Sequence, residues 1–401
     1  MHRVVVTGAG TISAFGPSLA DADAALRAGR SAIAPLTIPG AETLNQKIAA
    51  HASFYALTDY FEPRAAGVLD RTAQFTLIAA REAVGQAGFS PDEALAEQTA
   101  VIIGTGIGGQ ETQEEGYRRH FLEGKRPHPL SVPKIMANAP ASQVSMEFGF
   151  KGPAFAVASA CASATHAIGQ AFQMVRTGVA RAAVTGGTEA LLQSGTMRAW
   201  EALRVMSNDA CRPFSLGRKG MVLGEGAGVF VIERYEDARA RGADILCEIA
   251  GHGMSADAGD ITAPDPGGMA RAIAGALRDG GLDADDVDYI NAHGTGTTAN
   301  DAAESRAILL AFGERGHELP VSSTKSMHGH ALGGAGGIEF ACLIASMRGG
   351  YAPPTINFVE PDPNCPIDCV PNEARDLKIG VALSNSFAFG GLNAVLAVKA
   401  V

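Results

Sequence analysis

Short apolar runs and longer stretches of helical spacing alternate along most of the chain. The apolar runs, bounded by Gly or polar residues, predict strands at 4–6, 100–103, 153–157, 181–187, 229–233, 246–250, 289–291, 320–323, 379–383 and 394–398. The stretches of helical spacing predict helices at 65–87, 165–175, 235–242, 268–280, 301–312 and 336–347. This alternation is typical of an α/β protein with layered sheets.

One predicted strand runs into a block of very small residues that contains a cysteine. The strand 153–157 precedes Cys161, and the helix that follows at 165–175 is apolar on most faces, which predicts a buried helix. A cysteine at a helix N-terminus faces unpaired N–H groups and the positive end of the helix dipole, and both favour the thiolate. Cys161 is therefore a candidate nucleophile. The alternative is a small buried hydrophobe, which is what a lone cysteine in an Ala-rich segment usually is.

Two Gly-rich loops in the second half place histidines and a lysine at predicted strand ends, where α/β proteins build their sites. The first loop contains His293, and the second contains Lys325, His328 and His330. A metal bound by His328 and His330 is the competing interpretation. We expect no metal, because no Cys or carboxylate ligand is close in sequence and Lys325 would oppose a cation.

Acidic residues near these loops are candidates for structural support. The apolar, Gly-rich neighbours of Lys325 predict partial burial, and a buried lysine needs a carboxylate partner, for which Glu304 and Glu339 are the candidates. Asp301 is expected to cap the helix 301–312.

Composition excludes several classes of protein. The 401 residues, 46% of them hydrophobic, are enough for a large core in two domains or two halves of one fold. No apolar run reaches the length of a membrane span, and the chain enters a strand directly, so we expect neither a membrane span nor a signal peptide. The six cysteines lack zinc-ligand spacing, and reduced thiols fit a cytoplasmic chain. A net charge of −10 disfavours nucleic-acid binding.

Two Gly motifs resemble dinucleotide-binding loops. Gly8 and Gly10 follow the first strand as a predicted turn, and 104–109 reads G-x-G-x-x-G after another strand. Either match alone is weak evidence. A short-chain dehydrogenase also needs a Tyr with a Lys four residues later, which none of the six tyrosines has. A nucleotide-binding oxidoreductase is therefore disfavoured.

Cys161, His293, Lys325 and His330, in this order and with these neighbours, resemble the elongating β-ketoacyl-[acyl-carrier-protein] synthases of type II in the thiolase superfamily. The resemblance extends over essentially the whole chain, and its most specific motifs are 159–163, 291–301, 322–330 and 385–391. A narrower resemblance, to the nodulation protein E group, is carried by 200–205, 211–214 and 326–330.

The resemblance implies a thiolase-like fold of two duplicated α/β halves in a layered αβαβα arrangement. Residues 1–245 would carry Cys161, and residues 246–401 would carry the two histidines and the lysine. It implies a decarboxylative condensation of an acyl chain on Cys161 with malonyl-carrier protein, which yields a 3-oxoacyl product and CO2. It also implies no cofactor, since the substrates bring phosphopantetheine with them.

The resemblance also implies roles for single residues. His293 and His330 would donate hydrogen bonds to the enolate, and the backbone N–H groups of Cys161 and Phe389 would form an oxyanion hole. Lys325 would be catalytic; tuning of histidine protonation, contact with the malonyl carboxylate and ordering of the site all remain open. Thr295 and Thr297 would bind the pantetheine arm. Phe387 and Phe389 would form the gate, and Ile107 and Trp200 would line the acyl pocket. Ala388 and Leu392 depart from the family's Gly and Thr in the gate, which with Trp200 predicts an altered acyl-length preference.

The carrier protein is acidic, so an acidic enzyme needs a local basic patch, for which Lys125, Arg126 and Arg204 match the family. The resemblance predicts a homodimer and leaves a heterodimer open. A non-catalytic chain-length factor shares the fold but lacks the nucleophile, so Cys161 disfavours this alternative. Acyl length, unsaturation, pathway and carrier stay open.

Overall fold

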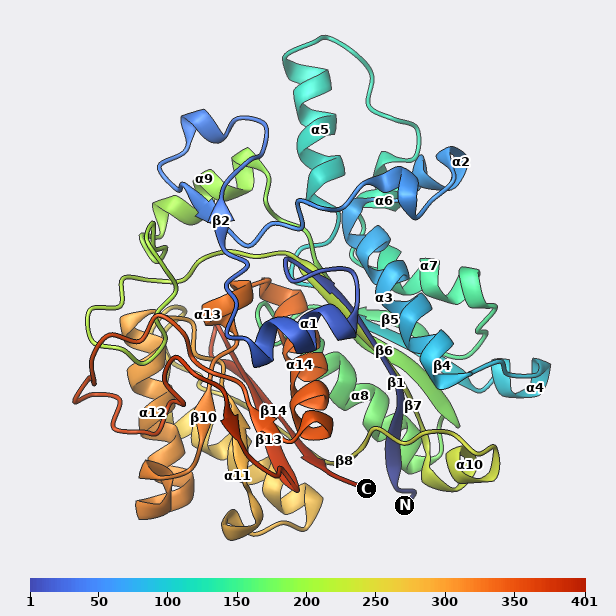
Figure 1. Ribbon diagram of the computed structural model, residues 1–401. Coiled ribbons are helices and arrows are strands. Elements are labelled where there is room, and N and C mark those ends of the chain that lie inside the picture. Colours follow the sequence, from blue (N-terminus) through green and yellow to red (C-terminus); the bar gives the residue numbers. More distant parts are fainter.

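The computed structural model describes residues 1–401, and its main feature is a ten-stranded sheet with the order β10-β9-β13-β14-β8-β1-β7-β6-β4-β5 (Figure 1). The first half contributes β1 (Val4–Ser13), β4 (Thr99–Gly104), β5 (Ala154–Val157), β6 (Ala182–Glu189) and β7 (Gly226–Arg234). The second half contributes β8 (Cys247–Ala256), β9 (Tyr289–Asn291), β10 (Val321–Ser322), β13 (Val381–Ala388) and β14 (Leu392–Lys399). Two short pairs lie outside this sheet: β2 (Ala34–Pro35) with β3 (Ile48–Ala49), and β11 (Tyr351–Ala352) with β12 (Arg375–Asp376).

The two halves of the sheet repeat one another. Counted outward from the centre, each half places its first, fifth, fourth, second and third strands in that order. In both halves the first two of the four neighbouring pairs are antiparallel and the last two are parallel. The halves join where β1 pairs with β8 over Val4–Val6. Because the repeat restarts at β8, we propose the boundary between the halves at residues 245 and 246.

Helices connect most of the strands. They are α1 (Leu19–Arg27), α2 (Pro63–Ala66), α3 (Arg71–Ala87), α4 (Glu93–Ala96), α5 (Gln110–Phe121), α6 (Ser131–Ile135), α7 (Ala139–Phe148), α8 (Ser163–Thr177), α9 (Ser194–Ala202), α10 (Tyr235–Ala240), α11 (Pro266–Gly280), α12 (Thr298–Phe312), α13 (Lys325–His328) and α14 (Ala335–Gly349). None of them is both long and apolar enough to cross a membrane.

The helices form three layers around the sheet. In Figure 1, α8 and α14 lie in the centre, α3 and α7 cover the outer face of the first half, and α11 and α12 cover that of the second half. Each half of the sheet thus forms one β layer between two helix layers, and the predicted αβαβα layering is confirmed. The helix after Cys161 is buried, as predicted, because side chains such as Ile168 and Phe172 of α8 pack into a core shared by strands of both halves.

The segment Gly8–Gly10 lies inside β1, so the prediction of a turn there was wrong. A Cβ atom on Gly8 would lie 2.0 Å from the carbonyl oxygen of Ala83, and one on Gly10 would lie 2.1 Å from that of Ala79. These glycines allow α3 to approach the strand closely, and pattern reading took them for turn residues.

Other boundaries also differ from the predictions. The Pro- and Ala-rich segment 127–141, whose composition is typical of a loop, contains α6 and the start of α7. The segment 384–393, whose glycines are typical of a turn, is mostly strand, with only 389–391 between β13 and β14. The predicted helix at 65–87 is divided into α2 and α3. These differences arise because tertiary packing, which local spacing does not report, extends and breaks the elements.

Candidate active site

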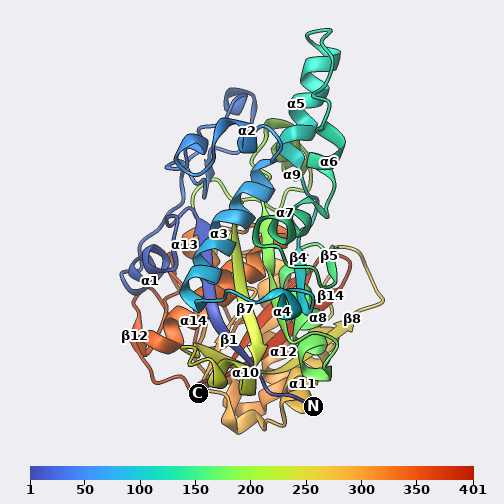
Figure 2. The ribbon, with the colours of Figure 1, turned by 90° about the vertical axis from the view of Figure 1, so that its right-hand side faces the viewer.

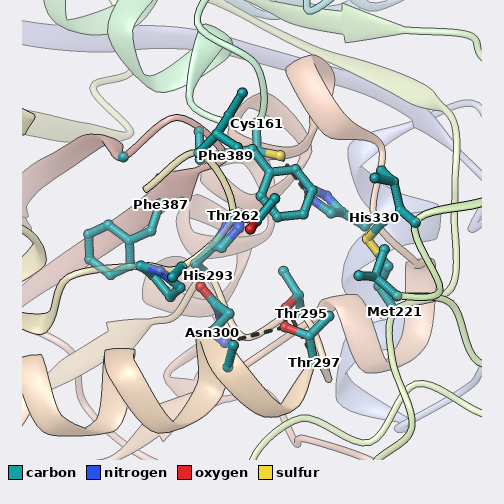
Figure 3. A pocket seen from close by; sticks show the side chains of 18 of the residues that line it. Cys161, Met221, Thr262, His293, Thr295, Thr297, Asn300, His330, Phe387 and Phe389 are labelled. Carbon is teal, nitrogen blue, oxygen red and sulfur yellow. Dashed lines mark hydrogen bonds between the residues drawn. The ribbon is translucent and has the colours of Figure 1, made fainter. Parts of the chain in front are cut away.

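A cavity of about 270 Å³ is lined by side chains from both halves (Figure 3). Cys161 comes from the first half, and His293, His330 and Phe389 come from the second. The structure therefore brings the predicted nucleophile and both predicted histidines to one place.

Local hydrogen bonds form the sharp turn that carries Cys161 between β5 and α8. Ala160 has a φ of +48°, in the left-handed region. The Ser163 hydroxyl accepts the N–H of Ser159 at 2.8 Å and donates to the carbonyl of Ala160 at 2.7 Å. The thiol is thus held at the start of a buried helix, 5% exposed.

Burial outweighs the features of the helix start that favour a thiolate at Cys161. Burial raises the pKa of the Cys161 thiol to about 11, although the Lys325 charge and the backbone N–H groups of Phe389 and Cys161 act in the other direction. The resting sulfur is therefore a thiol. The two N–H groups that act on the pKa of this sulfur are the predicted oxyanion donors.

The second half holds His293 through buried charges. Glu304 accepts the backbone N–H of His293 at 2.8 Å and that of Gly294 at 2.7 Å. The Lys325 Nζ lies 3.4 Å from the Nδ1 of His293, donates to its carbonyl at 2.6 Å, and pairs with Glu339. Of the two candidate carboxylates, Glu339 is thus the partner of Lys325.

This contact determines which nitrogen of His293 carries the proton. An ammonium group can only donate, so Nδ1 accepts and Nε2 carries the hydrogen toward the cavity. Burial first, and then the Lys325 charge, holds the pKa of His293 and of His330 well below the ordinary value, so both imidazoles are neutral. A neutral imidazole with Nε2–H is the donor that the predicted role requires.

His330 lies between Cys161 and His293. Its Nε2 is 3.2 Å from the Cys161 sulfur, and its ring centroid is 5.2 Å from that of His293 (Figure 3). Its Nδ1 is buried without a hydrogen-bond partner. Because an orphaned N–H is rarer than an orphaned acceptor, we assign the proton to Nε2.

Sulfur and two imidazoles within reach of one another are also possible ligands of a soft metal ion. The ligand atoms of Cys161, His293 and His330 lie within 4.8 Å of one another. His328, the other histidine considered for a metal, is elsewhere: its Nε2 contacts the Thr324 hydroxyl at 2.9 Å and its ring packs against Phe15.

The predicted threonine pair lines the same cavity. The hydroxyl oxygens of Thr295 and Thr297 are 2.9 Å apart. Thr297 also caps α12 by accepting the N–H of Asn300, so the prediction that Asp301 caps this helix was wrong. Asp301 instead accepts the N–H of Gly296 at 3.2 Å from inside the first turns of α12. It thereby holds the loop that contains Thr295 and Thr297 through the backbone of Gly296.

Arg218 is a candidate that no sequence motif indicates. Its buried guanidinium donates to the carbonyls of Thr297 at 3.3 Å and Thr298 at 3.2 Å, and it lies 3.6 Å from Asp301 and pairs with Asp362. These contacts join segments far apart in the sequence. Arg218 thus braces the loop that presents the two threonines.

Both phenylalanines predicted to form a gate line the cavity, but of the two residues predicted for the acyl pocket only one does. Phe387, Phe389 and Trp200 line the Cys161 cavity, and the Trp200 ring stacks on Phe389 with centroids 6.1 Å apart and planes inclined by 20°. Ile107 lies outside this lining and is 44% exposed. The structure therefore does not bring Ile107 to the cavity within one chain.

Sequence reasoning also missed apolar residues of the cavity wall. Met221, Ile261 and Leu332 line it, yet none stands in a chemical motif. They come from three separate loops, so only the fold reveals them.

The three predicted patch residues lie in two separate segments of the first half. Lys125 and Arg126 follow α5, which projects beyond the rest of the molecule in both views (Figures 1 and 2). Arg204 follows α9 and is adjacent to Leu203, which lines the cavity. Lys125 is also paired with Glu123 at 2.8 Å. Of the three, Arg204 is the residue near the cavity.

Comparison with known proteins gives one consistent family. The chain matches the models "Beta-ketoacyl synthase, N-terminal domain" over residues 1–238 and "Beta-ketoacyl synthase, C-terminal domain" over residues 246–359. It is 46% identical to nodulation protein E of Rhizobium sp. (strain N33), over 100% of both chains. It is 44% identical to 3-oxoacyl-[acyl-carrier-protein] synthase 2 of Staphylococcus aureus (strain COL), over 99% of this chain and 98% of the relative. The solved structure of the ishigamide ketosynthase/chain length factor superposes with a TM-score of 0.95 and 35% identity, covering 100% of this chain and 99% of that one.

Proposed function

This chain belongs to the β-ketoacyl synthase family of condensing enzymes, and we propose that it extends an acyl chain carried on Cys161 with a malonyl unit from an acyl carrier protein. The products are a 3-oxoacyl carrier protein and CO2, as in the elongation of fatty acids or specialised lipids. The observation that supports this most is the convergence of the Cys161 sulfur with the ring nitrogens of His293 and His330 within 4.8 Å.

The first step moves the acyl group onto the enzyme. The Cys161 sulfur attacks the thioester carbonyl carbon, the bond to the pantetheine sulfur breaks, and the thiol proton leaves with that sulfur. The N–H groups of Cys161 and Phe389 bind the oxyanion, and Nε2–H of His330, 3.2 Å from the attacking sulfur, stabilises negative charge on it. Two easier steps thus replace one difficult one.

The second step forms the carbon–carbon bond. The malonyl thioester loses CO2, and the electron pair passes to its thioester oxygen as an enolate. Nε2–H of His293 and of His330 donate to this oxygen in a buried site where such bonds are strong. The enolate carbon then attacks the acyl carbonyl on Cys161, and the sulfur leaves as a thiolate that takes a proton from water.

We assign to Lys325 the role of fixing the tautomer and the neutral state of His293. Its ammonium faces Nδ1 and thereby keeps the proton on Nε2, and its charge opposes protonation of the imidazole. Glu339 balances that charge inside the protein.

The partners follow from the same assignment. The proposed carrier protein brings phosphopantetheine past Thr295 and Thr297, and no other cofactor is required for these steps. We propose a homodimer, because β5 is an edge strand of the sheet with Phe155 exposed and Met146 exposed on the adjacent α7. A measured mass of one chain in solution would contradict the dimer. Six unpaired cysteines fit a cytoplasmic setting.

The test is intact mass spectrometry after mixing the protein with acyl-carrier proteins of several chain lengths. Wild type should gain one acyl group, and Cys161→Ala should gain none. Cys211→Ala, which removes another buried thiol outside the cavity lining, is the matched control and should be acylated like wild type. Absence of an adduct with every carrier would favour a non-catalytic chain-length-factor role.

A further inference from the structure

Glu189 is a fully buried carboxylate that none of the steps above uses. It is the last residue of β6, and its side chain contacts no Lys, Arg or His. A buried charge without a cationic partner is expensive unless several hydrogen bonds compensate it. The residues that supply these bonds therefore indicate what Glu189 does.

The donors come from two loops in different halves of the molecule. In the loop after β4, the Thr105 hydroxyl donates at 3.0 Å, the Gly106 N–H at 2.6 Å and the Ile107 N–H at 3.4 Å. From the second half, the Gly333 N–H donates at 3.1 Å to the same oxygen that Gly106 contacts. One carboxylate oxygen thus joins the two halves.

The two loops meet on this carboxylate with no space between them. A Cβ atom on Gly333 would lie 2.1 Å from the Gly106 nitrogen and 2.6 Å from the carboxylate oxygen. One on Gly106 would lie 2.8 Å from that oxygen. The close approach therefore requires glycine at both positions.

The Gly333 loop continues directly from the catalytic histidine. His330 precedes Gly333 by three residues, and Leu332 between them lines the Cys161 cavity with a φ of +40°. Fixing the Gly333 N–H thus limits how far His330 can move from the Cys161 sulfur, 3.2 Å away. Glu189 itself touches no reacting atom.

The charge of Glu189 also acts on the thiol. An ionised Glu189 raises the pKa of Cys161, whereas Lys325 lowers it, and the other titratable groups that face the sulfur are the neutral His293 and His330. Burial raises the pKa of Glu189 itself to about 7. At the alkaline pH where the Cys161 thiol titrates, Glu189 is therefore ionised.

We propose that Glu189 is a positioning residue that clamps the His330 loop to the loop after β4 and thereby fixes the surroundings of the Cys161 thiol. The expected effect on catalysis rests on the proposed function, because that function gives His330 its role. The effect on the surroundings of the thiol can be measured without turnover.

The test compares Glu189→Gln with Glu189→Asp and with Glu233→Gln, which neutralises another buried carboxylate that pairs with Arg241 instead. Alkylation of Cys161 by iodoacetamide is followed by intact mass across a pH series. Glu189→Gln should shift the alkylation midpoint to lower pH by about half a unit, equivalent to about a threefold faster reaction at a fixed pH below the midpoint. Glu233→Gln should leave the midpoint unchanged.

Glu189→Asp separates the clamp from the charge. It keeps the carboxylate but withdraws the oxygen from Gly333, so kcat should fall about tenfold with little change in KM, and the alkylation midpoint should not move to lower pH. A wild-type alkylation profile for Glu189→Gln, or wild-type kcat for Glu189→Asp, would overturn the proposal. If Glu189→Gln does not fold, the Glu189→Asp result decides. A wild-type protein that is alkylated at Cys161 but never acylated would instead contradict the proposed function.

Discussion

The two halves of the molecule have the same strand order but present different chemistry at equivalent places. In the first half, the third strand, β5, leads through a short turn into α8 and presents the Cys161 thiol among small residues. In the second half, the third strand, β10, leads through α13 and a short following segment toward α14, and this connection presents Lys325 and His330. Backbone N–H groups serve the thiol, whereas buried carboxylates position the lysine and His293.

The duplicated scaffold thus determines where the thiol and the imidazoles meet. The hydrogen bonds and charges around each group determine its protonation state and therefore its role. A thiol that must become an anion only transiently can remain in an apolar turn. Imidazoles that must remain neutral donors need a fixed tautomer, which Lys325 provides for His293. Acylation should therefore depend on Cys161 with His330 beside it, whereas decarboxylation should also require His293.

The largest expected effect separates these two steps. His293→Ala removes one of the two donors to the enolate, so condensation should fall by about 10³-fold. Cys161 should still gain an acyl group, because His293 does not contact the sulfur. Radiolabelled CO2 release and intact mass, measured on the same sample, check both halves of the prediction. Loss of the acyl adduct in this variant would contradict the division of labour.

Breaking the buried ion pair should reveal how much the second half depends on charge. Lys325→Met leaves Glu339 buried without its partner, and we expect a loss of about 3–5 kcal/mol in the free energy of unfolding. The double variant Lys325→Met/Glu339→Gln should recover most of that stability but not the activity. Urea denaturation of the three proteins checks this. Equal losses in the single and double variants would show that the pair is not coupled.

Arg218→Lys tests the brace beneath the threonine loop. Lysine keeps the charge but cannot serve the carbonyls of Thr297 and Thr298 and the carboxylate of Asp362 together. We expect KM for the carrier-linked substrate to rise about tenfold while kcat changes less. A fall in kcat without a change in KM would place Arg218 in a different role. Arg241→Lys, in a partly buried pair with Glu233, is the control.

Trp200 should determine acyl length through its stacking on the gate. Trp200→Gly removes that contact and opens space, so turnover should shift toward longer acyl carriers by about threefold or more. Trp200→Phe keeps a ring and should shift the profile less. Kinetics with short, medium and long acyl carriers would decide, and an unchanged profile for Trp200→Gly would remove Trp200 from the acyl pocket.

The smallest effects concern the carrier surface. Arg204→Glu, beside the cavity, should raise KM for the carrier about threefold at low salt, and the effect should diminish as salt screens it. Arg126 follows the projecting α5. In the proposed dimer it would serve the cavity of the partner subunit, so Arg126→Glu should also raise KM for the carrier. Equal KM values for wild type and both variants would contradict the patch.

Much of the fold follows from local pattern. Short apolar runs such as 289–291 and 229–233 predicted strands because such runs can be buried on both faces of a sheet. The Gly-rich loops at strand ends, together with Cys161, His293, Lys325 and His330, predicted the site, and the resemblance supplied the reaction. Such signals are local or carried by motifs.

Only the tertiary structure decided which groups are partners. It selected Glu339 over Glu304 for Lys325, and it revealed Arg218 and Glu189, whose contacts join residues far apart in the sequence. It also placed Gly8 inside a strand and made Cys161 a thiol at rest, because close packing and burial depend on what surrounds a residue. Spacing along a chain reports periodicity and short-range bonding, but desolvation and long-range pairing are properties of the folded interior alone.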